Sequence, residues 1–176
     1  MPLPGKGSEQ PLATITGDAM TAVVERYGDE MLRLAMLYLG SREQAEDAVQ
    51  DSFIKIFRAA HGDQISKSFV MRVLVNTCKD YLKSGWAKNV TLMEQCPEVA
   101  AESGPVPVTE EGALRREILA LPPKYREVIL LRYYEGFAVG EIAHMLNAPQ
   151  PTVSIRIRRA CKLLEKRLEG VPREDM

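Results

Sequence analysis

Residues 138–168 read AVGEIAHMLNAPQPTVSIRIRRACKLLEKRL and contain the pattern that decides the fold. From Ala138 to Leu146 the apolar residues recur at helical spacing, and the residues N-A-P-Q at 147–150 interrupt this spacing. A longer helix is expected to begin near Pro151 or Thr152, because proline suits the first turn of a helix. A short helix, a tight turn and a second helix form a helix-turn-helix, whose second helix fits the major groove of DNA.

The second helix of this motif is strongly basic, although the chain of 176 residues has a net charge of only −1. Residues 151–168 contain six bases and the single acid Glu165. Early residues of such a helix face base edges, and later cations reach phosphates. We expect these base contacts from Thr152, Ser154, Ile155 and Arg156, and phosphate contacts from Arg158, Arg159 and Lys162. The alternative is a solvated basic face on a structural helix.

The rest of the chain also has the periodicity of helices. Helical spacing extends to Leu39, with an apolar stripe at Val24, Tyr27, Met31, Leu34, Ala35 and Tyr38. It resumes from Ser41 to about Ala60, from about Ser66 to Ser84, from Ala113 to Leu121 and from Tyr125 to Tyr134. Ser41 and Gln44 have the spacing of a capping box. No segment alternates as a strand would, so the sequence predicts an all-α fold.

Composition divides the chain into two small helical domains. Between Thr91 and Ala113 there are five acids, three prolines and no base, which predicts a flexible acidic linker over 91–112. Residues 1–17 are rich in proline, glycine and polar residues, and we expect them to be disordered. The predicted domains are therefore a helical bundle at 18–90 and the helix-turn-helix domain at 113–176.

Several classes of protein are excluded by the same sequence. The longest apolar run, Leu34 to Leu39, has six residues, whereas a helix needs about twenty to span a bilayer. We therefore expect a cytoplasmic protein without stable membrane insertion. The spacing of Cys78, Cys96 and Cys161 indicates reduced thiols.

No active site is expected either. Glu141 and His144 have the E-x-x-H spacing of a di-iron site, but the sequence lacks a second copy and its partner glutamates. No serine or cysteine lies in a nucleophile motif. We accordingly predict no catalytic residue, no metal and no cofactor, and hence a protein that is not an enzyme.

Several stretches of the chain, taken together, carry a family resemblance. They are QAEDAVQDSF at 44–53, FVMRVLVN at 69–76 with Asp80 and Lys83, LPPKYR at 121–126, LLRYYEG at 130–136, EIA at 141–143 and TVSIRIRRA at 152–160. Their order on both sides of an acidic linker resembles the extracytoplasmic-function (ECF) group of bacterial RNA polymerase sigma factors, in the sigma-70 family. The resemblance makes the bundle region 2-like and the helix-turn-helix domain region 4-like.

This resemblance implies three sets of site residues. The polymerase-binding set is Asp47, Gln50, Asp51 and Phe53, of which Phe53 has the alternative of a core position. The set for the single-stranded minus-ten element is Asp63, Gln64, Lys67, Asn76, Lys79 and Lys83. For Asn76 the alternative is a buried amide within the bundle. The basic helix at 151–168 would read the duplex minus-thirty-five element with the residues named above.

The chain also departs from the pattern of the family. Phe69 stands where the family has tryptophan, and Lys83 stands where it has arginine. Pro151 and the pair Ser154 and Ile155 replace the glycine and the lysine-serine pair of the basic helix. These last differences change what the helix can read, so no promoter sequence is carried over.

The resemblance also implies a function and partners. A sigma factor binds core RNA polymerase, recognises the minus-thirty-five and minus-ten elements and promotes promoter opening. The expected partners are core RNA polymerase, promoter DNA as duplex and as non-template single strand, and an anti-sigma factor. One alternative is a helix-turn-helix regulator that binds DNA without forming a holoenzyme. Another is a helical adaptor that binds proteins only.

Overall fold

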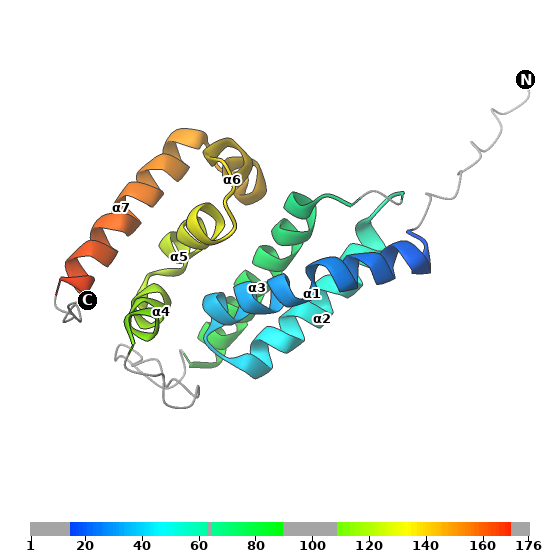
Figure 1. Cartoon of the computed structure of the whole chain (residues 1–176), viewed down its shortest axis with the longest axis horizontal. Coiled ribbons are helices and arrows are strands. Elements are labelled where there is room, and N and C mark those ends of the chain that lie inside the picture. The colour runs from blue at the N-terminus through cyan, green and yellow to red at the C-terminus, as the bar shows by residue number, and fades with distance from the viewer. Residues whose placement is uncertain (1–14, 63–64, 90–108, 170–176) are drawn as a thin grey trace, which may run out of the picture.

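Three long helices make up the first half of the protein in the computed structural model, which describes residues 15–62, 65–89 and 109–169. They are α1 (Gly17–Leu39), α2 (Arg42–Ala59) and α3 (Lys67–Asn89), packed as a bundle (Figure 1). The Ser41 hydroxyl accepts a hydrogen bond from the backbone N–H of Gln44 at 3.4 Å, which confirms the predicted start of α2.

Shorter helices form the second half. They are α4 (Glu110–Ala120), α5 (Pro123–Ile129), the π-helical turn η1 (Leu130–Tyr134), α6 (Val139–Leu146) and α7 (Gln150–Leu168). Between α6 and α7 the chain turns at Asn147, whose φ of 49° is left-handed, a conformation that asparagine tolerates well. The described residues contain no strand that forms a sheet. The all-α fold and the helix-turn-helix are therefore confirmed.

Some local details differ from the sequence expectations. On α1 the buried residue is Val23, while Val24 is 42% exposed, so including Val24 in the buried stripe was wrong. The reason is that α1 packs along Val23, Tyr27 and Met31, a stripe one residue earlier at its start. The single helix expected over 125–134 consists of α5 followed by the wider π-helical turn η1. At the end of η1 the backbone N–H of Glu135 donates a hydrogen bond to the Leu130 carbonyl.

The segments expected at 1–17 and 91–112 each extend slightly into a helix of the structure. Within the segment 1–17, Ile15 is buried, Thr16 caps α1 and Gly17 begins it, while residues 1–14 lie outside the described residues. Most of the expected linker, residues 90–108, also lies outside them, and α4 begins at Glu110. None of the helices in the described ranges has the length and apolarity to cross a membrane.

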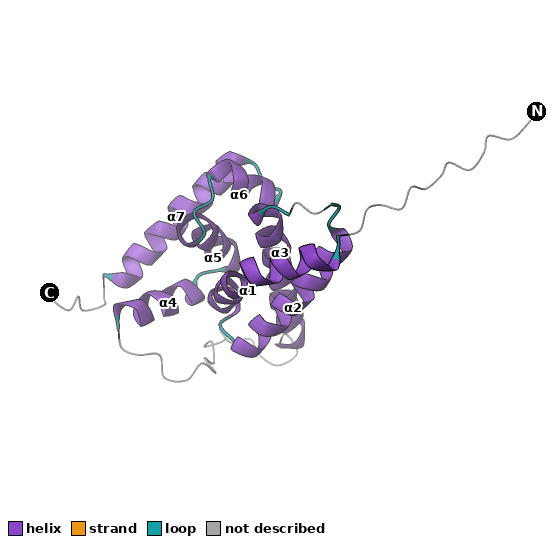
Figure 2. Ribbon diagram, turned by 45° about the vertical axis from the view of Figure 1, so that its right-hand side comes forward, coloured by secondary structure: helices purple, strands orange, loops and turns teal. Residues whose placement is uncertain are grey.

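The two halves pack directly against each other (Figure 2). Helix α1 contacts α4, α5 and η1, and α3 contacts α6. Buried residues of both halves, such as Tyr38 of α1 and Val128 of α5, belong to one continuous apolar cluster. Burial of apolar surface therefore stabilises the arrangement of the halves as well as each half alone.

Gly40 is required by the turn between α1 and α2. It ends α1 with a φ of 77°, and an added Cβ would lie 3.3 Å from Cδ2 of Leu119 in the other half. We expect Gly40→Ala to lower the free energy of unfolding by about 1–2 kcal/mol, measured by urea denaturation, because L-residues disfavour this conformation. Gly85→Ala is the matched control, since Gly85 lies within α3 with nothing within 4 Å of an added Cβ. That change should stabilise by about 0.5–1 kcal/mol. Equal effects at the two sites would contradict this prediction.

Candidate nucleic-acid interface

Helix α7 presents most of the predicted DNA-contacting residues to solvent. Val153 is fully buried and anchors the start of the helix, while Ile155 is 42% exposed. Thr152, Ser154 and Arg156 are half-buried. The predicted phosphate contacts are all exposed, namely Arg158, Arg159 and Lys162. The structure thus combines a fixed inner face with an accessible basic outer face.

A groove of about 500 Å³ lies beside this face and adds two residues to it. Ser154, Arg158 and Lys162 of α7 line it together with Arg132 and Tyr133 of η1. Arg132 donates a hydrogen bond to the Phe137 carbonyl at 3.0 Å, and Tyr133 is 65% exposed. Sequence reasoning missed both residues, because helical periodicity does not report which other element borders the recognition helix.

The minus-ten residues predicted on α3 are only partly accessible. Asn76 and Lys83 are exposed, so the alternative of a buried amide at Asn76 is wrong. Lys67 and Lys79 are half-buried and form ion pairs. The two remaining predicted residues, Asp63 and Gln64, lie outside the described residues.

The predicted polymerase contacts lie on α2. Asp47 and Gln50 are exposed, while Phe53 is half-buried and packs against the core. Asp51 is exposed and accepts a hydrogen bond from the Tyr81 hydroxyl of α3 at 2.6 Å. This hydrogen bond, with burial, raises the pKa of Tyr81 to about 12. The acidic residues of α2 thus remain available on a helix that is tied to α3.

One buried carboxylate connects the two predicted DNA contacts. Glu127 of α5 is 3% exposed, and its Oε2 accepts from Lys79 Nζ of α3 at 2.8 Å and from the Tyr38 hydroxyl of α1 at 3.3 Å. Its Oε1 lies 3.6 Å from Arg156 Nη1 of α7. Burial and the neighbouring Glu127 charge raise the pKa of Tyr38, so its hydroxyl keeps the proton that it donates.

A second ionic cluster involves Lys67 at the start of α3. Its Nζ lies 2.5 Å from Oε1 of Glu30, a residue of α1, and 3.1 Å from Oε2 of Glu135, the residue that follows η1. The Lys67 ammonium also lies 5.7 Å from the centre of the Phe137 ring. Burial raises the pKa of Glu135 to about 7, because its side chain is only 1% exposed.

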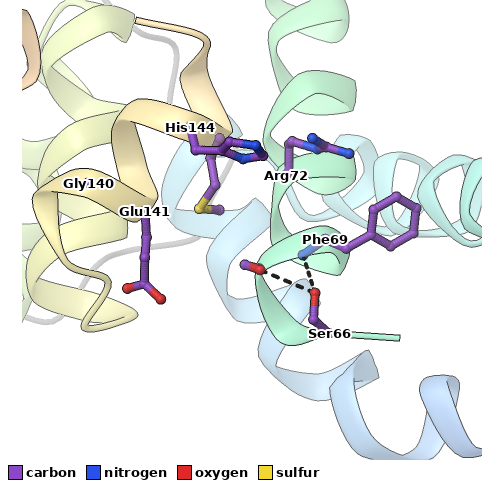
Figure 3. A pocket seen from close by; sticks show the side chains of 8 residues that line it. Ser66, Phe69, Arg72, Gly140, Glu141 and His144 are labelled. Carbon is purple, nitrogen blue, oxygen red and sulfur yellow. Dashed lines mark hydrogen bonds between the residues drawn. The ribbon is translucent and has the colours of Figure 1, made fainter. Parts of the chain in front are cut away.

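A cavity of about 400 Å³ separates the start of α3 from α6. Figure 3 shows Ser66, Phe69 and Arg72 on one side, and Glu141 and His144 on the other. Glu141 accepts a hydrogen bond from the Ala138 amide at 2.8 Å, so this carboxylate caps α6. Within the described part of the chain, no group of three residues could hold a metal ion.

Comparison with known families identifies both halves. The model for Sigma-70 region 2 matches residues 23–88, and the model for Sigma-70, region 4 matches residues 111–164. The ECF RNA polymerase sigma factor SigW of Bacillus subtilis is 29% identical over 170 residues, covering 88% of this chain and 91% of SigW. The ECF RNA polymerase sigma-E factor of Haemophilus influenzae is 29% identical over 167 residues, covering 86% and 88%.

Solved structures support the same fold. A sigma factor RpoE, in a co-crystal with the anti-sigma factor NepR from Bartonella quintana, matches with a TM-score of 0.68 and 18% identity. That match covers 89% of this chain and 100% of the other. CnrH in complex with the cytosolic domain of CnrY matches with a TM-score of 0.63 and 20% identity, covering 89% and 92%. Since the two family models match 23–88 and 111–164, more than half of the sequence, the chain belongs to the sigma-70 family of RNA polymerase sigma factors, in its ECF group.

Proposed function

We propose that this sigma factor contacts promoter DNA through two separate surfaces. The region 4-like domain reads the duplex minus-thirty-five element with the start of α7, and Arg158, Arg159 and Lys162 hold the phosphates. The observation that carries this assignment is the exposed basic face of α7, which follows the tight turn at Asn147. Arg132 and Tyr133 border the same groove and extend the contact surface.

The region 2-like bundle supplies the second surface. Asn76 and Lys83 lie exposed on α3, where an amide and a cation suit an unpaired base and its backbone. Lys67, Lys79, Asp63 and Gln64 complete the proposed set of minus-ten contacts. Core RNA polymerase binds α2 through Asp47, Gln50, Asp51 and Phe53. Supporting this, Asp47, Gln50 and Asp51 are exposed.

An anti-sigma factor is part of the same proposal. The sigma factor RpoE was solved with the anti-sigma factor NepR, and CnrH, which has a similar fold, was solved with the cytosolic domain of CnrY. We propose a corresponding partner for this chain, which would act in the cytoplasm together with the polymerase. The domain division at 18–90 and 113–176 belongs to the proposal, as does the absence of catalysis and of a cofactor.

The decisive experiment combines polymerase binding with transcription. Purified chain and core RNA polymerase are mixed, and the complex is isolated and used to transcribe a library of promoter fragments. We expect a stable complex and new start sites that depend on sequence. Asn76→Ala should reduce opening at the minus-ten element without reducing polymerase binding, because Asn76 lies on α3 and the polymerase residues lie on α2.

A matched control for Asn76→Ala is Gln44→Ala, which removes a similar exposed amide from the start of α2. This change should leave start-site selection unchanged. Failure of the folded chain to bind core polymerase would contradict the proposal. Autonomous binding of a dimer to a palindromic duplex would then favour the helix-turn-helix regulator.

A further inference from the structure

Glu135 is a buried carboxyl group to which the proposed function gives no role. The residue follows η1 in the second half of the chain, and its side chain is only 1% exposed. Lys67 Nζ of α3 lies 3.1 Å from its Oε2, but within the described ranges neither oxygen of Glu135 meets a donor in hydrogen-bond geometry. An ionised carboxylate is costly to bury unless its oxygens are satisfied. The surroundings of Glu135 therefore favour a carboxyl group that carries a proton.

Lys67 is shared between Glu135 and a second carboxylate. Oε1 of Glu30, a residue of α1, lies 2.5 Å from Lys67 Nζ and is closer to it than Glu135 is. Two carboxylates and one ammonium group leave one negative charge in excess, and a single bound proton makes the cluster neutral. Removal from water favours the neutral form. Three side chains from three elements thus provide a place for one proton.

The proton lies between the two carboxyl groups. Glu30 and Glu135 interact through a side-chain hydrogen bond, which requires a proton because ionised carboxylates only accept. Burial, together with the adjacent Glu30 group, raises the pKa of Glu135 to about 7. For Glu30, hydrogen bonds with Lys67 and Glu135 outweigh the effect of burial and lower the pKa. Glu135 is therefore the donor and Glu30 the acceptor.

The other charged groups around this cluster have contacts of their own. On α1, the charge of Arg33 acts on Glu30 and helps to keep that carboxylate ionised. On α5, η1 and α6 the contacts are Lys124 over the Tyr125 ring, Arg126 and Arg132 on backbone carbonyls, Glu127 with Lys79 and Arg156, and Glu141 at the start of α6. His144 of α6 is exposed and lines the cavity beside α3. Glu135 therefore titrates under the influence of Lys67 and Glu30.

We propose that Glu135, Glu30 and Lys67 form a proton-binding site between the two halves, in which Glu135 donates to Glu30 and uptake of one proton from solvent stabilises the contact. Glu135 belongs to the second half, whereas Glu30 and Lys67 belong to the first. The complete site thus exists only when the halves are packed together. This inference goes beyond the proposed function and does not depend on it.

The pH dependence follows from the two environments of Glu135. In water the group has its ordinary pKa of 4.5, and in the packed chain burial raises the pKa to about 7. The packed chain thus binds a proton that the unfolded chain has released. The stability that this site contributes is therefore fully present below about pH 4.5 and is lost as the pH rises through about 7. From pH 6 to pH 8, this group alone should raise the equilibrium constant for unfolding about tenfold.

An NMR titration of the side-chain carboxyl carbons measures the proton directly. The full chain is labelled with ¹³C-glutamate, and the signal that is absent from Glu135→Gln identifies Glu135. Its midpoint is expected near pH 7, because the packed environment favours the protonated form. A midpoint below about pH 6 would overturn the proposal.

Glu30→Gln tests whether the two halves share the proton. This change leaves Lys67 to pair with Glu135 alone, so Glu135 should bind its proton about tenfold more weakly and its midpoint should fall by about one pH unit. A midpoint that does not fall would show that burial alone holds the proton, and the shared site would be wrong. Lys67 stays unchanged in every variant, because the proposed function assigns it to the minus-ten element.

Urea denaturation at pH 6 and pH 8 measures the effect on stability. The unsubstituted chain should show the tenfold change over and above that of Glu135→Gln, because glutamine has no proton to lose. Equal pH dependence of these two chains would overturn the proposal even if the sigma-factor function holds.

The matched control is Glu117→Gln, because Glu117 of α4 pairs with Arg167 of α7 at 3.7 Å within the second half. It should keep the pH dependence of the unsubstituted chain. If Glu135→Gln does not fold, the titrations of the unsubstituted chain and of Glu30→Gln decide the question, with the Glu135 signal assigned through its backbone.

Discussion

Arg126→Ala is expected to lower the free energy of unfolding by about 3–5 kcal/mol, the largest effect on stability that we predict. The Arg126 guanidinium is buried and donates to the Tyr38 carbonyl through Nη1 and to the Leu119 and Leu121 carbonyls through Nη2. Alanine would leave buried carbonyls without these donors, and each unsatisfied group costs about 1–3 kcal/mol.

The position of these carbonyls explains why one side chain matters so much. Tyr38 lies in the last turn of α1, and Leu119 and Leu121 lie at the end of α4. The last carbonyls of a helix have no partner within the helix, and a cation near them also interacts favourably with the helix dipole. Arg126 therefore caps two helices, one from each half of the chain.

Urea denaturation of the full chain measures this prediction. Arg116→Ala is the control, because Arg116 is an exposed arginine of α4 and its removal should cost less than about 0.5 kcal/mol. Arg126→Lys should lie between the two, since an ammonium keeps the charge but lacks the planar fork of donors. A loss for Arg126→Ala no greater than that of the control would show that the carbonyls find other donors.

The double change Arg158→Ala and Lys162→Ala is expected to have the largest effect on DNA binding. Both side chains are exposed on α7, and neither belongs to the ionic clusters that join the halves. Loss of two phosphate contacts should reduce the slope of log affinity against log salt concentration by about 1.8. By the same relation, the double variant is expected to bind DNA roughly 60-fold more weakly than the unsubstituted chain at 0.1 M salt.

The measurement is a titration of the minus-thirty-five duplex at several salt concentrations. Arg42→Ala with Arg58→Ala is the matched control, because it removes the same charge from exposed positions on α2. This control should leave the slope nearly unchanged. If both double variants lower the slope equally, the effect comes from net charge rather than from contacts of α7.

Much of the fold was predictable because it depends on local patterns. Apolar spacing located the helices, Ser41 marked the start of α2, and the interruption at 147–150 marked the turn before α7. The exposed basic face of α7 also followed from spacing, since residues on one face of a helix recur every three or four positions. The error at Val24 was a shift of one residue in the same periodic pattern.

The remaining site residues depend on contacts between distant parts of the chain. The Tyr38 hydroxyl and Glu127 are separated by 89 residues in sequence but form a hydrogen bond. No periodicity within α5 indicates that Glu127 meets Lys79, or that Arg126 reaches the end of α1. The sequence alone thus determined the helices, the helix-turn-helix and its basic face, because these arise from neighbours along one helix. Only the tertiary structure decided which of the basic residues are exposed and which are paired with buried carboxylates, because that depends on how the two halves pack.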